Sequence, residues 1–188
     1  MFFSELLAAI KPADVGFTVD IPADWMQGRS AFGGLQVAIA TVAMRTLEPE
    51  MPLRTVQATF LAPLPQGRVF ARVDVMRRGK NTVHIQVQLR AGSDVVCSVT
   101  GVFGSARESI VSVVPAQITV NTLRAKKIPF VEGVTPAFSQ HFRTEVAQGV
   151  LPFSGSPLSE AVINLDMIDR GKTTESHVIA IADFTPPL

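Results

Sequence analysis

Two segments of the sequence contain residue types that could act on a carbonyl group. The first is the triplet Phe32-Gly33-Gly34, which opens an apolar stretch that includes Gln36. Because glycine has no Cβ atom, a ligand can approach its backbone closely, and the free N–H groups at a helix start attract negative charge. We therefore consider these residues as a candidate substrate-binding group, with the glycine N–H groups as an oxyanion site. A tight turn with close helix packing explains the same glycines without a ligand.

The second segment is the carboxylate of Asp183, which directly follows the apolar run HVIAIA. A carboxyl group at the edge of an apolar surface resists ionisation and can act as a general base on water. An aspartate at a helix terminus or in a turn is the alternative, since TPPL follows soon after. The residue type alone does not decide between these two interpretations.

The sequence lacks the motifs of several other reaction and binding classes. The sequence contains neither a G-x-S-x-G elbow nor a P-loop, and AFGGL lacks the third glycine of a dinucleotide-binding fingerprint. His84, His141 and His177 are far apart and lack the spacing of metal ligands, so we expect no metal site. The formal net charge of +1 and the absence of a Lys/Arg cluster argue against nucleic acid as a partner.

The sequence also predicts the cellular compartment of the protein. The single cysteine, Cys97, excludes an internal disulfide, fits a reducing compartment and is expected to be buried. The N-terminal segment MFFSELLAAIKPAD lacks a basic leader and a cleavage signal, so no signal peptide is predicted. No apolar run approaches the roughly 18 residues of a membrane-spanning helix. We therefore expect a cytoplasmic protein with no membrane contact.

The pattern of elements around the candidate residues predicts an antiparallel sheet wrapped around a helix. Residues 31–46 are apolar on nearly every side, with contacts at three- and four-residue spacing, which is typical of a buried helix. A strand at 16–21 precedes this helix, and four strands follow up to residue 104, joined in part by the turns RRGKN and RAGSD. This order predicts an α+β chain of the hot-dog type, in which the sheet curls around the central helix.

The chain is expected to contain a second, incomplete copy of this unit. We place the first hot-dog unit at 1–104, a linker or crossover at 105–149, and the start of the second unit at 150–188. Strand, polar turn and apolar helix recur in the last part, but the strands that would cover the helix are absent. We favour a truncated form of a longer protein, with coverage by another subunit as the alternative. An open sheet edge predicts a homodimer or larger homo-oligomer.

Three segments resemble the acyl-CoA thioesterase II family and its thioesterase-like relatives. They are RSAFGGLQVAIATVAM, the strand-rich block from RTVQATFLAP to VTGVFG, and HVIAIADFTPPL. The resemblance covers most of 16–104 and recurs over 150–188. Members of this family are double hot-dogs, in which two fused units join their sheets side by side and place the catalytic groups at the interface.

The resemblance implies a function and a site. It implies hydrolysis of a fatty acyl-CoA thioester by an activated water, with no metal or organic cofactor. The acid of the family stands in a segment that opens the second helix, which corresponds to Asp183 here. The Thr and Gln partners of that acid come later in the family, beyond Leu188 in this numbering. The chain is thus expected to carry the acid without these partners.

Two other functions remain open at this point. A non-catalytic hot-dog protein that binds acyl chains, or assembles through its sheet edge, fits a first unit without an acid. A hot-dog hydratase or dehydratase is less well supported, because that chemistry needs a His–Asp pair near the helix. His177 lies six positions before Asp183 and thus not on one helix face with it.

Overall fold

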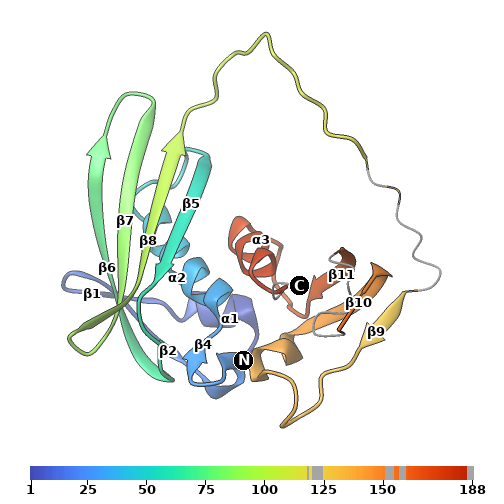
Figure 1. The fold of residues 1–188 in the computed structure, drawn as a ribbon. Coiled ribbons are helices and arrows are strands. Elements are labelled where there is room, and N and C mark those ends of the chain that lie inside the picture. Colours follow the sequence, from blue (N-terminus) through green and yellow to red (C-terminus); the bar gives the residue numbers. More distant parts are fainter. Residues whose placement is uncertain (118, 120–124, 151–154, 157–159, 186–188) are drawn as a thin grey trace.

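The computed structural model describes residues 1–117, 119, 125–150, 155–156 and 160–185, which form two units joined by an extended segment (Figure 1). The elements of the first unit are α1 (Phe3–Ala8), β1 (Lys11–Ala13), β2 (Gly16–Ile21), η1 (Ala23–Trp25), β3 (Met26–Gln27), β4 (Ser30–Ala31), α2 (Gly33–Arg45), β5 (Leu53–Phe60), β6 (Gly67–Arg78), β7 (Thr82–Ala91) and β8 (Asp94–Gly104). Its large sheet has the strand order β1-β2-β6-β7-β8-β5, and every neighbouring pair is antiparallel.

Alternating side chains explain why this sheet covers a helix. On β7, Val83, Ile85, Val87 and Leu89 are buried, while the side chains between them are only partly buried. The apolar face of the sheet packs against α2 through β6, β7 and β8. Gly92 has a positive φ of 60° and turns the chain between β7 and β8. The hot-dog fold expected from the sequence is confirmed, and Cys97 is buried in β8 as predicted.

The second unit is smaller. It contains β9 (Lys126–Ile128), η3 (Ala137–His141), β10 (Phe142–Gly149), β11 (Ala161–Met167) and α3 (Glu175–Ala182). The strands form an antiparallel sheet with the order β11-β10-β9. The sequence analysis assigned 105–149 to a linker, but β10 lies inside that range and pairs with β11. Its alternation of buried Phe142, Thr144 and Val146 is short and includes a polar residue, so the pattern did not stand out from the crossover.

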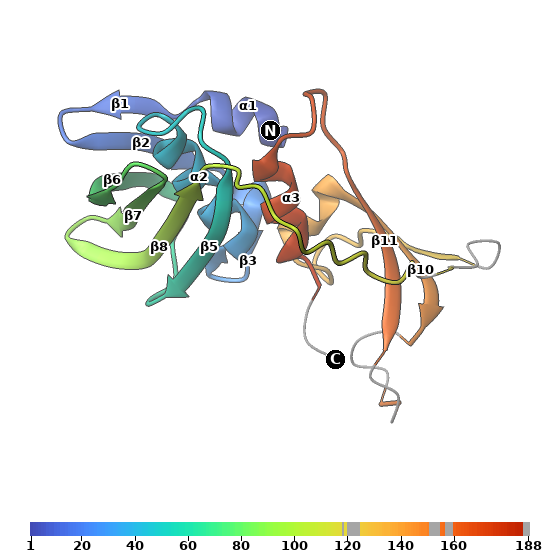
Figure 2. The ribbon, with the colours of Figure 1, turned by 90° about the horizontal axis from the view of Figure 1, so that it is seen from above.

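The two central helices lie side by side between the sheets (Figure 2). Helix α2 contacts both the large sheet and α3, so other parts of the protein cover it on several sides. All eleven residues from Gly34 to Met44 except Val42 are buried. This arrangement explains the apolar character of the segment: part of its surface faces the second unit and not only the enclosing sheet.

Polar contacts also join the two units. The guanidinium of Arg45 at the end of α2 forms a bidentate ion pair with Glu175 at the start of α3, with Nη2 2.7 Å from Oε2. Near the N-terminus, Ser4 donates its backbone N–H and its hydroxyl to Asp169, at 2.9 and 2.6 Å. These contacts hold α1, α2 and α3 in fixed relative positions.

The segment that connects the units runs away from both of them in its first half (Figure 1). In this half, between residues 105 and 117, Ile110, Val111, Val113 and Val114 are exposed. None of the helices in the described part of the chain is long and apolar enough to cross a membrane.

Candidate active site

Asp183 stands at the C-terminal end of α3, where it is the C-cap residue with a φ of −92° and a ψ of −2°. The resemblance had placed it in a segment that opens the second helix, and the structure corrects this position. The helix starts earlier because Thr174 and His177 form capping hydrogen bonds: the Thr174 N–H donates to Nδ1 of His177 at 3.1 Å. The acid therefore ends α3 and points toward the other unit.

The Asp183 carboxylate lies against the first residues of α2. A Cβ atom built on Gly33 would be 2.6 Å from Oδ2 of Asp183, so only a glycine leaves room for the carboxylate there. The backbone N–H of Gly34 interacts with the carboxylate. The free N–H groups of the helix start, which the sequence analysis assigned to an acyl carbonyl, are thus partly used to hold the acid.

Two opposing effects set the pKa of Asp183. Burial of the carboxylate is the larger effect and raises the pKa above the ordinary value, while the interaction with the Gly34 N–H lowers it. The residue as a whole is exposed at the end of the helix, but its carboxylate is turned inward to the contact with α2. A carboxylate in this setting holds a proton more readily than a free aspartate does.

Gly34 serves a different purpose from Gly33. A Cβ atom on Gly34 would lie 2.6 Å from the carbonyl oxygen of Ala180 and 2.8 Å from its Cα atom. The missing side chain therefore allows α3, and not the enclosing sheet, to approach the start of α2. The two glycines thus have separate packing roles: Gly33 makes room for the acid and Gly34 for close helix packing.

A cavity of about 1000 Å³ opens beside Asp183, between the two units. Its lining residues come from the β3–β4 hairpin, the start of α2, the end of β5, the second sheet and the end of α3. They are Gln27, Ser30, Ala31, Gly33, Gln36, Phe60, Leu61, Ala62, Pro63, Ile128, Pro129, Phe130, Thr135, Pro136, Phe138, Ser139, Thr144, Ile163, Asp183, Phe184 and Thr185. Asp183 is the only ionisable side chain among these described lining residues. The cavity is thus mainly apolar, with one acid at its wall.

Of the four residues predicted to bind substrate, Gly33 and Gln36 line the cavity and Gly34 contacts the acid. Phe32 is buried instead and is not among the lining residues. Its ring stacks on Phe138 with centroids 4.0 Å apart, and Phe138 itself faces the cavity. The structure therefore gives Phe32 a packing position behind the cavity wall.

Comparisons with known proteins agree with this geometry. Residues 21–104 match the sequence profile of the acyl-CoA thioesterase N-terminal domain. The resemblance to acyl-CoA thioesterases is thereby confirmed. No curated protein matches the chain.

Nearly the whole chain also superposes on solved structures. A hot-dog protein of unknown function from Alicyclobacillus acidocaldarius is 19% identical with a TM-score of 0.79, over 98% of this chain and 69% of that one. A putative thioesterase II from Thermobifida fusca YX is 13% identical with a TM-score of 0.79, over 98% and 72%. An acyl-CoA thioesterase II from Mycobacterium marinum is 15% identical with a TM-score of 0.67, over 97% and 68%. At these identities the structures support the fold.

A buried His–Asp pair was not predicted from the sequence. Nε2 of His177 lies 2.9 Å from Oδ2 of Asp169, and both side chains are 5% exposed. Because Nδ1 of His177 accepts the Thr174 N–H, the ring donates from Nε2 to Asp169. Neither residue lines the cavity, so the pair lies outside the site and joins α3 to α1 through Ser4. The eight-residue separation in sequence carried no signal for this contact.

Within the described residues, no group of three or more His, Cys, Asp or Glu side chains is arranged to hold a metal ion.

Proposed function

We propose that this chain hydrolyses acyl-CoA thioesters, with Asp183 as the general base. The observation that carries the proposal is the placement of the Asp183 carboxylate at the start of α2, on the wall of a mainly apolar cavity. The apolar wall suits an acyl chain, and the acid at its edge suits a water that attacks the acyl carbon.

In the proposed reaction, Asp183 removes a proton from water as the water oxygen attacks the thioester carbonyl carbon. The carbonyl oxygen gains the negative charge of the tetrahedral intermediate. When the C–S bond breaks, the electron pair leaves with the sulfur of CoA, and the proton held by Asp183 is returned to that thiolate. The products are a carboxylic acid and free CoA, and Asp183 is again ionised. The raised pKa of Asp183 helps it to accept the proton.

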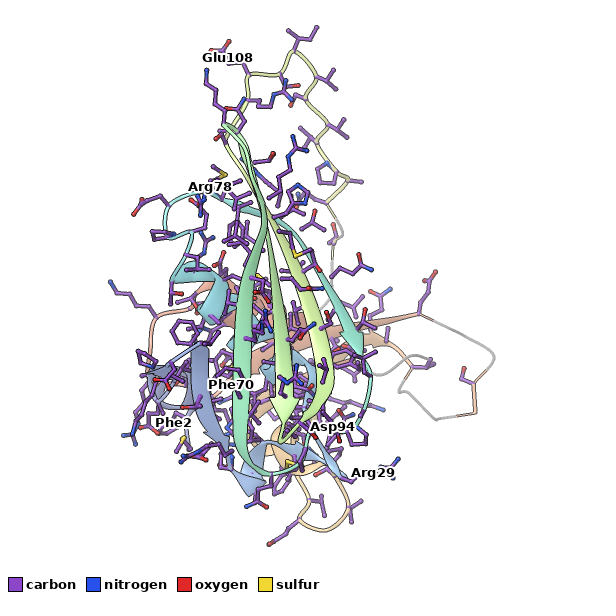
Figure 3. The ribbon with its side chains drawn as sticks, turned by 90° about the vertical axis from the view of Figure 1, so that its left-hand side faces the viewer. Phe2, Arg29, Phe70, Arg78, Asp94 and Glu108 are labelled. Carbon is purple, nitrogen blue, oxygen red and sulfur yellow. The ribbon has the colours of Figure 1, made fainter. Side chains whose placement is uncertain are left out.

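The test measures thiol release from a series of acyl-CoA substrates by the purified chain and by the Asp183→Asn variant. Loss of the base should lower kcat about 100-fold or more. Asp94→Asn is the matched control, since this residue is exposed at the start of β8 (Figure 3) and does not line the cavity. A decrease below about tenfold in the Asp183 variant, which is about 1.4 kcal/mol of barrier, contradicts a catalytic role.

Binding without turnover is a second candidate function. It is favoured by the interaction of the Gly34 N–H with Asp183, because this N–H group could otherwise stabilise an oxyanion. A protein of this kind would show thermal stabilisation by acyl-CoA with no thiol release. Wild-type turnover that depends on Asp183 would exclude it.

A further inference from the structure

Gln36 presents a buried hydrogen-bond acceptor that lacks a partner within the described part of the chain. The side chain is 2% exposed, and its Oε1 atom makes no hydrogen bond. Its Nε2 atom donates to the carbonyl oxygen of Ala31 at 2.8 Å and lies 3.4 Å from the Ser30 hydroxyl. Because the Ala31 carbonyl can only accept, this contact fixes the orientation of the amide. The atom without a partner is therefore Oε1.

A second buried polar side chain lines the same cavity from the other unit. Thr144 on β10 is 8% exposed, and its hydroxyl has no hydrogen-bond partner among the residues that the structure describes. A plain hydrocarbon chain would leave both Gln36 and Thr144 without partners, and an unpaired buried polar group is costly. The cavity therefore suits an occupant that brings a hydrogen-bonding group of its own.

Chemistry narrows the identity of that group. Oε1 of Gln36 needs a donor, whereas the Thr144 hydroxyl can both donate and accept. A hydroxyl on the ligand can donate to Gln36 and accept from Thr144. Gln36 also lies three residues after Gly33, and thus on the same face of α2, about 4.5 Å along the helix axis. The hydroxyl would then lie within a few carbon atoms of a thioester held at Asp183.

We propose that the cavity selects hydroxyacyl thioesters over unsubstituted acyl thioesters, and that Gln36 determines this selectivity. This inference rests on the proposed function, because it assumes that the cavity holds the acyl part of a thioester. It adds a substrate class that a mainly apolar wall alone would not indicate.

The experiment compares butanoyl-CoA with its 2-, 3- and 4-hydroxy derivatives on the purified chain. Dissociation constants are measured by calorimetry on the Asp183→Asn variant, and kcat/KM on the wild type, so that binding and turnover are separate readouts. At least one hydroxy isomer should bind about fivefold more tightly or better than butanoyl-CoA. The Gln36→Leu variant should lose this preference, and Thr144→Val should reduce it. Gln57→Leu, at an exposed position on β5, should retain it.

The outcomes separate the two proposals. Selective binding without thiol release would contradict hydrolysis and support the hydroxyl subsite. Thiol release with equal affinity for all four ligands would support hydrolysis and overturn the subsite. An equal loss for every ligand in Gln36→Leu would overturn it as well, because the amide would then hold a group common to all of them. The wild-type comparison decides the question even where a Gln36 variant fails to fold.

Discussion

Asp183 at the end of α3 occupies the space that a side chain on Gly33 at the start of α2 would fill. Oδ2 of Asp183 is 2.6 Å from the position of that absent Cβ atom, and Cζ of Phe60 is 3.0 Å from it. The candidate base thus belongs to the second unit, and the glycine that makes room for it belongs to the first. Neither unit alone presents the acid at the cavity wall.

Gly33→Ala is therefore expected to impair activity more than stability. The new methyl group would meet the movable end of Asp183 and displace the carboxylate, so we expect kcat to fall about tenfold or more. Gly34→Ala is the contrasting variant, because its methyl group would meet the rigid backbone of Ala180 at 2.6 Å. That variant should lose about 1–3 kcal/mol of unfolding free energy in chemical denaturation. Equal effects of both substitutions on activity and stability would contradict this division.

The pH dependence of turnover should report the raised pKa of Asp183. A general base works only when ionised, so kcat/KM should fall as the pH decreases through its pKa. Burial raises that pKa, and the midpoint should therefore lie above the ordinary value of about 4. The profile is measured as thiol release between pH 4 and 8. A midpoint at or below the ordinary value would contradict the burial of the Asp183 carboxylate.

Stability at low pH should depend on Asp169. Burial alone would raise its pKa, but hydrogen bonds from Ser4, His177 and the Arg170 backbone together hold it at about 2. Since a lowered pKa stabilises the fold above the unfolded value, this contribution should be lost as the pH falls from about 4 toward 2, by roughly 2 kcal/mol. Unfolding followed by circular dichroism against pH measures this loss.

Asp169→Asn provides the matched comparison for that titration. The variant should be less stable by about 2 kcal/mol at neutral pH and should show a smaller loss at acid pH. Asp166→Asn is the control, because that carboxylate is 66% exposed and pairs with Arg143 on the surface. A similar acid sensitivity in both variants would show that the Asp169 network contributes little.

Self-association is expected from the free edges of the large sheet. Strand β5 ends the sheet and pairs only with β8, and the chain leaves it with Phe60 and Leu61 exposed at 49% and 58%. We propose a homodimer or larger homo-oligomer, which light scattering would report as at least twice the mass of the chain. Phe60→Lys should shift the mass toward the monomer. A monomer at every concentration would contradict this proposal.

The hot-dog unit was predictable from the sequence because its signals are local. Strand β7 alternates apolar and polar residues, RRGKN and RAGSD punctuate the hairpins, and α2 is apolar on nearly all sides. Each of these patterns can be recognised from a short stretch of neighbouring residues. The antiparallel hairpins and the covering of α2 then followed from the need to bury the same faces.

The site was only partly predictable because it depends on distant contacts. Asp183 and Gly33 were both identified, yet nothing local indicated that one fills the space beside the other. The resemblance placed Asp183 at the wrong end of its helix, since helix boundaries depend on capping contacts such as Thr174 with His177. Phe32 was assigned to the ligand, but stacking on Phe138, over a hundred residues later, holds it in the core. Strand β10 escaped notice because its alternation is short and includes the polar residue Thr144.

The hydrogen bonds from Ser4 to Asp169 connect positions 165 residues apart. During synthesis on the ribosome, α1 emerges long before its acceptor, which is made 165 residues later. The large sheet can therefore assemble while α1 still lacks this partner. Docking of α1 onto Asp169 therefore follows assembly of the large sheet, and it fixes the acid-bearing helix only after Asp169 and α3 have left the ribosome.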